Sequence, residues 1–394
     1  MEASYSCPYC ALYRSILFGV PAGVYGAGND EMSALFNFSN SGFPYLFFAK
    51  TSWNIGAAIV PLLFVPLTET SARIPGYFGA YIVFLIFLIP CGAAQNFETM
   101  IAMDILGSAH HHWRASTRFL VPLAREAKKW RKNNPDEEPR YAEAEIDMPS
   151  VATRLEVSFK RPIKMLYTEW VVFSQTLWVS FAWGLLFLFQ SSVTQIFSTN
   201  YNYNTFQTTL IQLSLSVGAI IATLVNPIQD HLYLQSAKRS KTGTPIPEAR
   251  LHSSIPGSLL FTAGLFWYGW SSYPFLPWIV STLGIGCVGF GIYSIYLAVV
   301  NYLTDSYEKY NASALSAASL GRNTFGAFLP LASPALYTNL GFQWGSSLLG
   351  FVALVLGLAP VLLLVKKEEI RKRSPFMKEA TFAKEARRTI EDGV

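Results

Sequence analysis

Long apolar stretches run through most of the chain, and polar or basic segments separate them. A helix needs about 20 apolar residues to cross the hydrocarbon core of a membrane. Stretches of this kind occur at 12–28 (short), 45–67, 77–95, 170–190, 206–226, 257–274, 278–303, 312–334 and 343–365. The pattern predicts an all-α polytopic membrane protein with eight or nine spans.

The composition supports a membrane location. Charged residues make up only 14% of the chain, whereas soluble domains carry about 25%. Most of this charge lies in three blocks, at 114–164, 227–256 and 366–394. We therefore expect the protein to contact a lipid bilayer along most of its length, and we expect no nucleic-acid partner.

The basic residues predict the orientation of the second half. Loops predicted at 191–205, 271–277 and 335–342 contain no Lys or Arg. The alternate loop, 227–256, is basic, and the C-terminal block 366–394 contains nine Lys or Arg residues. Cytoplasmic segments are enriched in Lys and Arg, so the sequence predicts a six-helix bundle over 169–366, with both ends in the cytoplasm, and a charged cytoplasmic tail over 367–394.

The first half does not form a consistent topology by the same rule. A basic segment within 104–168 is predicted to be a cytoplasmic linker, because residues 114–164 contain twelve Lys or Arg residues. Residues 133–150 are acidic, polar and proline-containing, which is typical of a flexible linker. The spans within 1–103 leave the chain outside at residue 96, so one crossing before Trp113 is unaccounted for.

Short motifs give little support for catalysis or cofactor binding. The string "GIGCVGFG" (284–291) matches a dinucleotide fingerprint, but it lies within an apolar stretch, where small residues favour close helix packing. Three adjacent histidines (110–112) cannot all bind one metal from a helix, and Cys7 and Cys10 form an isolated CxxC pair. The sequence has no Walker motif or nucleophile elbow, so we expect no enzymatic activity, no cofactor and no metal.

Arg322 is the one charged residue deep within the 312–334 span. An intramembrane charge is costly and is therefore a functional candidate, although the side chain could instead extend to the cytoplasmic face. Other polar and aromatic residues in the spans could line a substrate cavity, or could serve as interfacial anchors and interhelical hydrogen bonds. These candidates are Gln175, Trp183, Gln190, Gln212, Asn226, Tyr293, Tyr296, Asn301 and Asn323.

Two sequons fit the pattern for N-glycosylation. Asn37 lies in a segment predicted to be outside, so it is a possible glycosylation site. Asn311 lies in a predicted cytoplasmic turn and is expected to be unmodified.

Several strings are similar to the major facilitator superfamily, specifically to its fungal twelve-helix drug:proton antiporters. The resemblance covers about 23–100 and 140–375, and it is carried by strings that include "PIPEARLHSSIPGSLLFTAGLFWYGWSSYP", "NYLTDSYEKYNASALSAASLGRNTFGAFLPL" and "LGFQWGSSLLGF". The N-terminal strings resemble helices one to three, and no counterpart of helices four to six is present. The absence of three helices would account for the missing crossing.

The resemblance implies roles for several charged residues in gating loops. Leu67, Glu69, Arg73 and Pro75 resemble the family's loop between helices two and three, although Ala72 stands where the family usually has Gly. Asp230 and Arg239 resemble the equivalent loop between helices eight and nine. Glu248 and Arg250 resemble the paired charges before helix nine.

The resemblance implies a secondary active transporter that exports small organic molecules, such as drugs or secondary metabolites, by proton antiport with alternating access. Its partners would be a small-molecule substrate and protons, and its location would be the plasma membrane. Glu169, Asp230 and Asp305 are candidate coupling carboxylates. The alternative is a truncated or degenerate, transporter-like protein that does not transport, because the N-terminal bundle is incomplete.

Overall fold

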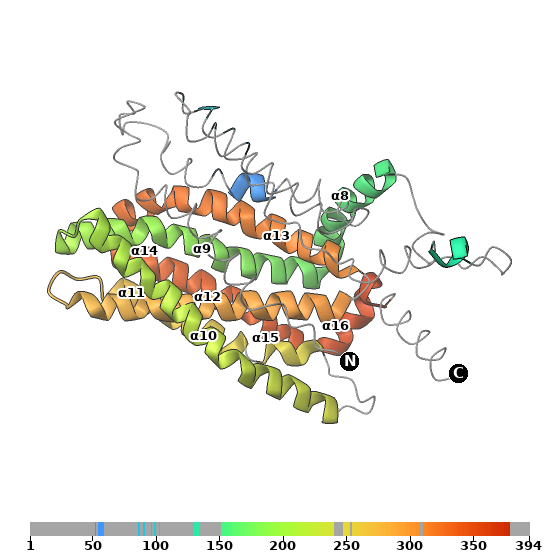
Figure 1. The fold of residues 1–394 in the computed structure, drawn as a ribbon. Coiled ribbons are helices and arrows are strands. Elements are labelled where there is room, and N and C mark those ends of the chain that lie inside the picture. The colour runs from blue at the N-terminus through green and yellow to red at the C-terminus, as the bar shows by residue number, and fades with distance from the viewer. Residues whose placement is uncertain are drawn as a thin grey trace.

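The computed structural model describes most of the second half of the chain and a few residues of the first half. The described residues are 52, 54–58, 86, 90, 96, 98–99, 102, 129–133, 151–239, 247–252, 254–307 and 310–378. The regular elements within these ranges are all helices (Figure 1). The predicted all-α fold is confirmed.

The helices follow one another with short connections. In chain order they are α8 (Val151–Thr168), α9 (Trp170–Tyr201), α10 (Thr205–Arg239), η2 (Pro247–Leu251), α11 (Ser254–Trp270), α12 (Trp278–Tyr307), α13 (Asn311–Phe328), η4 (Leu329–Ala332), α14 (Ser333–Leu356), α15 (Leu358–Val365) and α16 (Lys367–Arg373). Four helical stretches among the described residues are long and apolar enough to cross a membrane, namely Trp170–Tyr201, Thr205–Gln235, Trp278–Tyr307 and Asn311–Val365.

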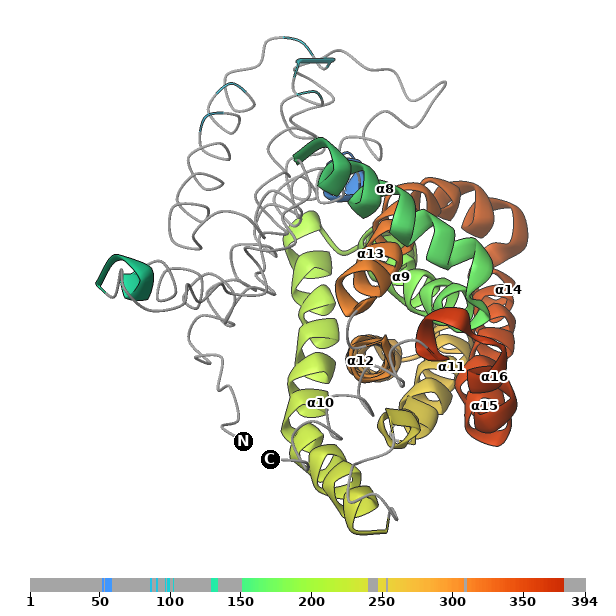
Figure 2. The ribbon, with the colours of Figure 1, turned by 90° about the vertical axis from the view of Figure 1, so that its right-hand side faces the viewer.

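Helix α9 lies at the centre of this bundle. It packs against α10, α12, α13 and α14, and its side chains Trp178, Leu185 and Phe189 are almost fully buried. Figure 2 shows α12 end-on, with α10 on one side and α11 on the other. By contrast, α10 exposes many large apolar side chains, including Leu210, Val217 and Leu224, as expected of a helix that faces lipid or another helix.

Glycines allow α12 to approach its two neighbours closely. A Cβ atom on Gly289 would lie 2.3 Å from the carbonyl oxygen of Leu215 in α10, and one on Gly291 would lie 2.4 Å from Cβ of Phe261 in α11. Gly218 of α10 faces the backbone of Gly286 in the same way, at 2.0 Å. The "GIGCVGFG" string therefore serves helix packing, as its apolar context predicted.

Two of the predicted loops are largely helical. Helix α9 continues through Ser191 and Ser192 to Tyr201, where the prediction placed a loop at 191–205. Both serines are buried, and Ser192 forms a 2.9 Å hydrogen bond with Tyr268. Helix α10 likewise continues through Pro227 to Arg239. Polar residues extend these helices because their side chains find partners on neighbouring helices.

The prediction of a loop at 335–342 is also wrong. Residues 333–340 are helical, and only Gly341 leaves the helical conformation, with φ 74° and ψ 169°. The chain reverses direction there, so that Tyr337 lies beside Gly345 and Ser346. This backbone conformation is accessible almost only to glycine.

Helix α8 occupies the end of the predicted linker. It buries Met165 and exposes Lys160 and Lys164, so it is an amphipathic helix rather than flexible chain. The segment 133–150, except Asn133, lies outside the described residues. The division of the chain into two bundles, a linker and a tail stays a prediction.

The close contact between α10 and α12 leads to a prediction about the stability of the folded protein. Gly289→Ala places a methyl group against the backbone of Leu215, so the helices must separate, and we expect the free energy of unfolding to fall by about 1–3 kcal/mol. Gly286→Ala is the matched control, because its Cβ would lie 3.6 Å from the nearest atom, the carbonyl oxygen of Ser214.

Thermal unfolding of the purified protein, followed by tryptophan fluorescence, would measure both variants. Equal unfolding temperatures for Gly289→Ala and Gly286→Ala would show that the close approach does not limit packing.

Candidate substrate site and cytoplasmic charge network

Arg322 lies against two aromatic rings from two other helices. Its Cζ atom is 4.7 Å from the ring centroid of Trp183 in α9 and 5.1 Å from that of Tyr296 in α12. The two rings are themselves 5.7 Å apart. An arginine over aromatic faces gains cation–π attraction, which is stronger where water is excluded. The structure thus stabilises this charge within the bundle, and we call Trp183, Tyr296 and Arg322 the arginine cluster.

The guanidinium of Arg322 keeps hydrogen-bonding capacity. Its Nη2 donates to Oγ of Ser319 at 3.4 Å, and its buried Nε has no hydrogen-bond partner among the described residues. None of the carboxylates that the structure describes forms an ion pair with it. A partly buried cation with donors to spare can bind a carboxylate, carbonyl or other acceptor of a ligand.

A polar face of α9 adjoins the arginine cluster. Thr176, Ser180 and Trp183 are spaced i, i+4 and i+7, so they lie on one side of the helix. A Cβ atom on Gly321, the residue before Arg322, would lie 2.5 Å from Thr176 and 2.7 Å from Ser180. The hydroxyls of Thr176 and Ser180 are buried without hydrogen bonds to described residues, so they are available to a ligand.

The next residues of α13 contact a helical turn of the N-terminal half. Nδ2 of Asn323 donates to the carbonyl oxygen of Ala57 at 2.8 Å, and Nδ2 of Asn54 approaches the carbonyl oxygen of Gly326 at 3.5 Å. Asn54, Ala57 and Asn323 are all buried. The arginine cluster therefore lies next to a contact between segments that are more than 250 residues apart in the sequence.

The remaining predicted cavity residues separate into three groups. Gln212 donates to the carbonyl oxygen of Gln190 at 3.0 Å. These two residues therefore form an interhelical hydrogen bond, which was the alternative to lining a substrate cavity. Gln175 and Asn226 each have buried polar atoms without a partner among the described residues. Tyr293 and Asn301 are half-buried on α12.

Sequence reasoning missed Asn54, Thr176 and Ser180 as possible members of the site. Asn54 is a polar residue within the predicted 45–67 span, and single hydroxyls in apolar helices are common. The helical spacing of Thr176, Ser180 and Trp183 was the signal that could have found two of them.

The ends of α10 and α12 carry a network of charged residues centred on Arg250 of η2. Its Nη1 lies 2.8 Å from Oδ1 of Asp230, and its Nε lies 3.2 Å from Oδ2 of Asp305. Tyr233 donates to Oδ2 of Asp305 at 2.8 Å, and the guanidinium covers its ring at 3.6 Å. One arginine thus joins α10, η2 and α12.

Glu248 forms a second ion pair, with Arg371 of α16. Nε and Nη2 of Arg371 each lie 2.8 Å from one oxygen of Glu248. The Glu248 side chain is only 4% exposed, whereas that of Arg371 is 44% exposed. Such two-point geometry is the strong form of an arginine–carboxylate pair, and it holds α16 against the bundle.

Glu169 holds the same C-terminal segment from another side. It lies at the junction of α8 and α9, is 1% exposed, and accepts hydrogen bonds from the hydroxyls of Tyr307 and Ser374 and from the backbone N–H of Phe376. Its carboxylate is therefore satisfied within the protein.

Comparison with known proteins agrees with the resemblance. No protein-family model matches the chain. The chain is 29% identical to the efflux pump atB of Aspergillus terreus over 80% of its own length and 82% of the pump. It is 36% identical to the MFS transporter cpaT of Aspergillus oryzae over 65% of its length and 51% of that protein.

A third relative is the major facilitator superfamily multidrug transporter FLU1 of Candida albicans, at 31% identity over 73% of the chain and 46% of the relative. The chain belongs to the major facilitator superfamily. It spans only about half the length of cpaT and FLU1. The relatives are named as transporters or efflux pumps, which agrees with the expectation that this superfamily member is not an enzyme.

Several residues that the superfamily resemblance singled out lie outside the described part. These are Leu67, Glu69, Ala72, Arg73 and Pro75 of the first gating loop, Asn37, the three histidines, and Cys7 with Cys10. Arg239 ends α10, and its side chain is not described. Among the described residues, no cluster of His, Cys, Asp and Glu could hold a metal ion.

The Glu248–Arg371 pair leads to a prediction that a buried ion pair contributes more to the free energy of unfolding than an exposed one. Glu248→Gln removes a buried carboxylate from a two-point pair, so we expect the free energy of unfolding to fall by about 1–3 kcal/mol. Glu369→Gln is the control, because Glu369 pairs with Arg373 on the same helix but both are exposed, and such pairs contribute less than about 1 kcal/mol.

Thermal unfolding and limited proteolysis of the C-terminal segment would compare the two variants. If Glu369→Gln destabilises the protein as much as Glu248→Gln, burial does not strengthen the Glu248 pair.

Proposed function

We propose that the protein exports small amphipathic organic molecules across the plasma membrane by alternating access coupled to protons. The observation that carries the proposal is the arginine cluster, a cation within membrane-spanning helices that is held by two aromatic rings. It adjoins the hydroxyls of Thr176 and Ser180, which form no hydrogen bonds with the part of the chain that the structure describes. Polar groups at such a depth in transporters mark substrate or ion pathways. The names of the relatives, efflux pump and multidrug transporter, support the same function.

The arginine cluster suggests how a substrate would bind. The guanidinium would donate to an acceptor group of the substrate, while Trp183 and Tyr296 would contact its aromatic or apolar body. The hydroxyls of Thr176 and Ser180 would add hydrogen bonds. The adjacent contact through Asn323 and Ala57 would let opening or closing of the two halves change the access to this site.

The cytoplasmic charge network offers groups for proton coupling. A proton on Asp305 would remove its negative charge and weaken its bonds to Arg250 and Tyr233. Of the two described carboxylates that pair with Arg250, Asp230 alone would then keep its negative charge. Because Arg250 joins three helical segments, this change would favour a different arrangement of their cytoplasmic ends.

A transport assay tests the function. The chain would be produced in yeast cells that lack their own broad-specificity exporters, and efflux of an amphipathic fluorescent dye would be followed. We expect efflux that a protonophore abolishes. Efflux that continues without a proton gradient would refute the coupling, and a chain that reaches the membrane without any efflux would refute transport.

The role of Arg322 has its own test in the same assay. Arg322→Gln removes the charge and the guanidinium donors, so we expect the initial efflux rate to fall by about tenfold or more. Arg322→Lys retains the charge but loses the planar contact with the rings, and it should give an intermediate rate.

Lys160→Gln, on the exposed face of α8, is the control for loss of a positive charge. Efflux by Arg322→Gln at the rate of this control, with equal amounts in the membrane, would exclude Arg322 from the substrate pathway.

A further inference from the structure

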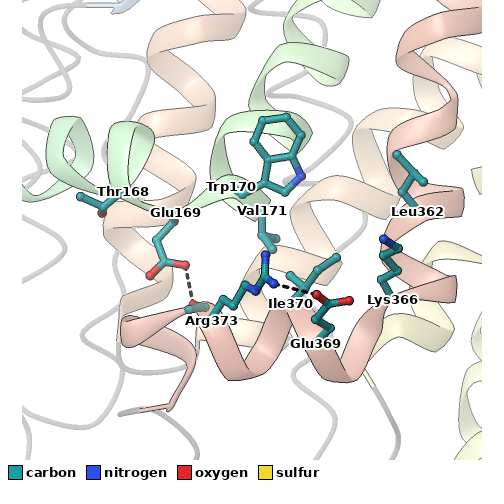
Figure 3. A pocket seen from close by; sticks show the side chains of 10 residues that line it. Thr168, Glu169, Trp170, Val171, Leu362, Lys366, Glu369, Ile370 and Arg373 are labelled. Atoms are coloured by element: carbon teal, nitrogen blue, oxygen red, sulfur yellow. Dashed lines mark hydrogen bonds and ion pairs between the residues drawn. The ribbon is translucent and has the colours of Figure 1, made fainter.

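A cavity lies away from the arginine cluster, at the end of the bundle that the basic residues place in the cytoplasm. It has a volume of about 400 Å³ and lies between the α8–α9 junction and the bend that joins α15 to α16 (Figure 3). Trp170 at its edge precedes Trp183 by 13 residues of α9, or about 20 Å along the helix. This cavity is therefore distinct from the proposed substrate site.

The polar side of this cavity carries two cations. Lys366, at the end of α15, forms no ion pair with any residue that the structure describes. Arg373 pairs with Glu369 at 2.9 Å, but the two side chains are 81% and 53% exposed. Exposed pairs of this kind contribute less than about 1 kcal/mol, so a ligand can replace either partner.

Glu169 also lines the cavity but does not compete for a ligand. Its oxygens already accept hydrogen bonds from Tyr307, Ser374 and the backbone of Phe376. The groups open to a ligand are therefore Lys366, Arg373 and Glu369. Together they match a ligand with a negative phosphate and a positive amine.

The other side of the cavity is apolar and exposed. Trp170 is 64% exposed and Leu362 is 51% exposed, and Phe173 packs against Trp170 with ring centroids 5.9 Å apart. Tryptophan at the end of a spanning helix is typical of the membrane interface. The cavity therefore lies where apolar helix α15 gives way to charged helix α16, at the level of lipid headgroups.

We propose that this cavity binds the headgroup of an aminophospholipid from the cytoplasmic leaflet. The phosphate contacts Lys366 and Arg373, the ammonium group contacts Glu369, and the acyl chains lie along Trp170 and Leu362. On binding, the ion pair between Glu369 and Arg373 is replaced by two contacts with the zwitterionic headgroup, one between Arg373 and the phosphate and one between Glu369 and the ammonium group. Each charged side chain therefore has a partner of opposite charge in the complex. Free phosphate would use the cations but neither Glu369 nor the apolar rim.

Phosphatidylethanolamine and phosphatidylcholine provide a sharp comparison. Both carry the same phosphate, but the trimethylammonium group of phosphatidylcholine has no N–H to donate to Glu369. The full chain would be exchanged into nanodiscs that contain the two lipids in equal amounts, and the lipids that remain bound would be quantified by native mass spectrometry. We expect enrichment of phosphatidylethanolamine by about tenfold, the value of one charge-assisted hydrogen bond.

Two variants test the assigned contacts. Glu369→Gln should abolish the preference for phosphatidylethanolamine while total lipid retention stays close to that of the wild type. Lys366→Gln with Arg373→Gln should lower the retention of both lipids by about tenfold. The control is Lys160→Gln with Lys164→Gln, which removes two exposed positive charges from α8 and should leave retention and preference unchanged.

Three results would overturn the proposal. One is equal retention of the two lipids by the wild type, and another is unchanged retention by the Lys366 and Arg373 double variant. The third is displacement of the lipids by inorganic phosphate, together with binding of phosphate alone to the detergent-purified chain, because this would mark a site for a free anion. None of these results depends on transport, so failure here is separate from failure of the proposed function.

Discussion

A bilayer offers no hydrogen bonds, and this constraint explains most of the structure. Each polar group within a spanning helix must find its partner inside the protein. Hydroxyls such as those of Thr223 and Thr304 bond to carbonyl oxygens one turn back, and Ser192 bonds to Tyr268 across two helices. Some buried polar atoms lack a hydrogen-bond partner among the described residues, and these become informative. Several lie on α9, where Thr176 and Ser180 adjoin Gly321, the residue before Arg322.

Charge is placed by the same constraint. Arg322 remains within the bundle because two aromatic faces replace part of its hydration. Near the ends of the spanning helices, Arg250, Glu248 and Glu169 connect segments that are distant in sequence. The final described residues of the chain are thereby held by two buried carboxylates. The first residues of the predicted charged tail, 367–378, are therefore part of the folded bundle.

The existence of the apolar helices could be predicted from the sequence, but their ends could not. Hydropathy located the spans after residue 170 and the packing role of the glycines in α12. It missed the helical continuation at 191–201, because burial by neighbouring helices outweighed the polar character of those residues. It also missed Gly341 as the turning point, because the nearby polar residues Thr338 and Asn339 remain helical on an exposed face.

The candidate site was only partly predictable for a related reason. Arg322 was evident as a charge in an apolar span, and Trp183 and Tyr296 were among the predicted cavity residues. Their mutual contact depends on the packing of three helices, which no single segment encodes. Asn54 could not be assigned to this region without knowing that its helical turn lies against α13.

The single-residue reversal at Gly341 also determines where the chain can be labelled. Helices on both sides of Gly341 pack directly against each other, as the contact between Tyr337 and Gly345 shows. An epitope or fluorophore attachment sequence inserted there has no slack backbone to absorb it. The connection at 271–277 has several residues outside regular helix, and it is the better place for a topological tag on that side of the membrane.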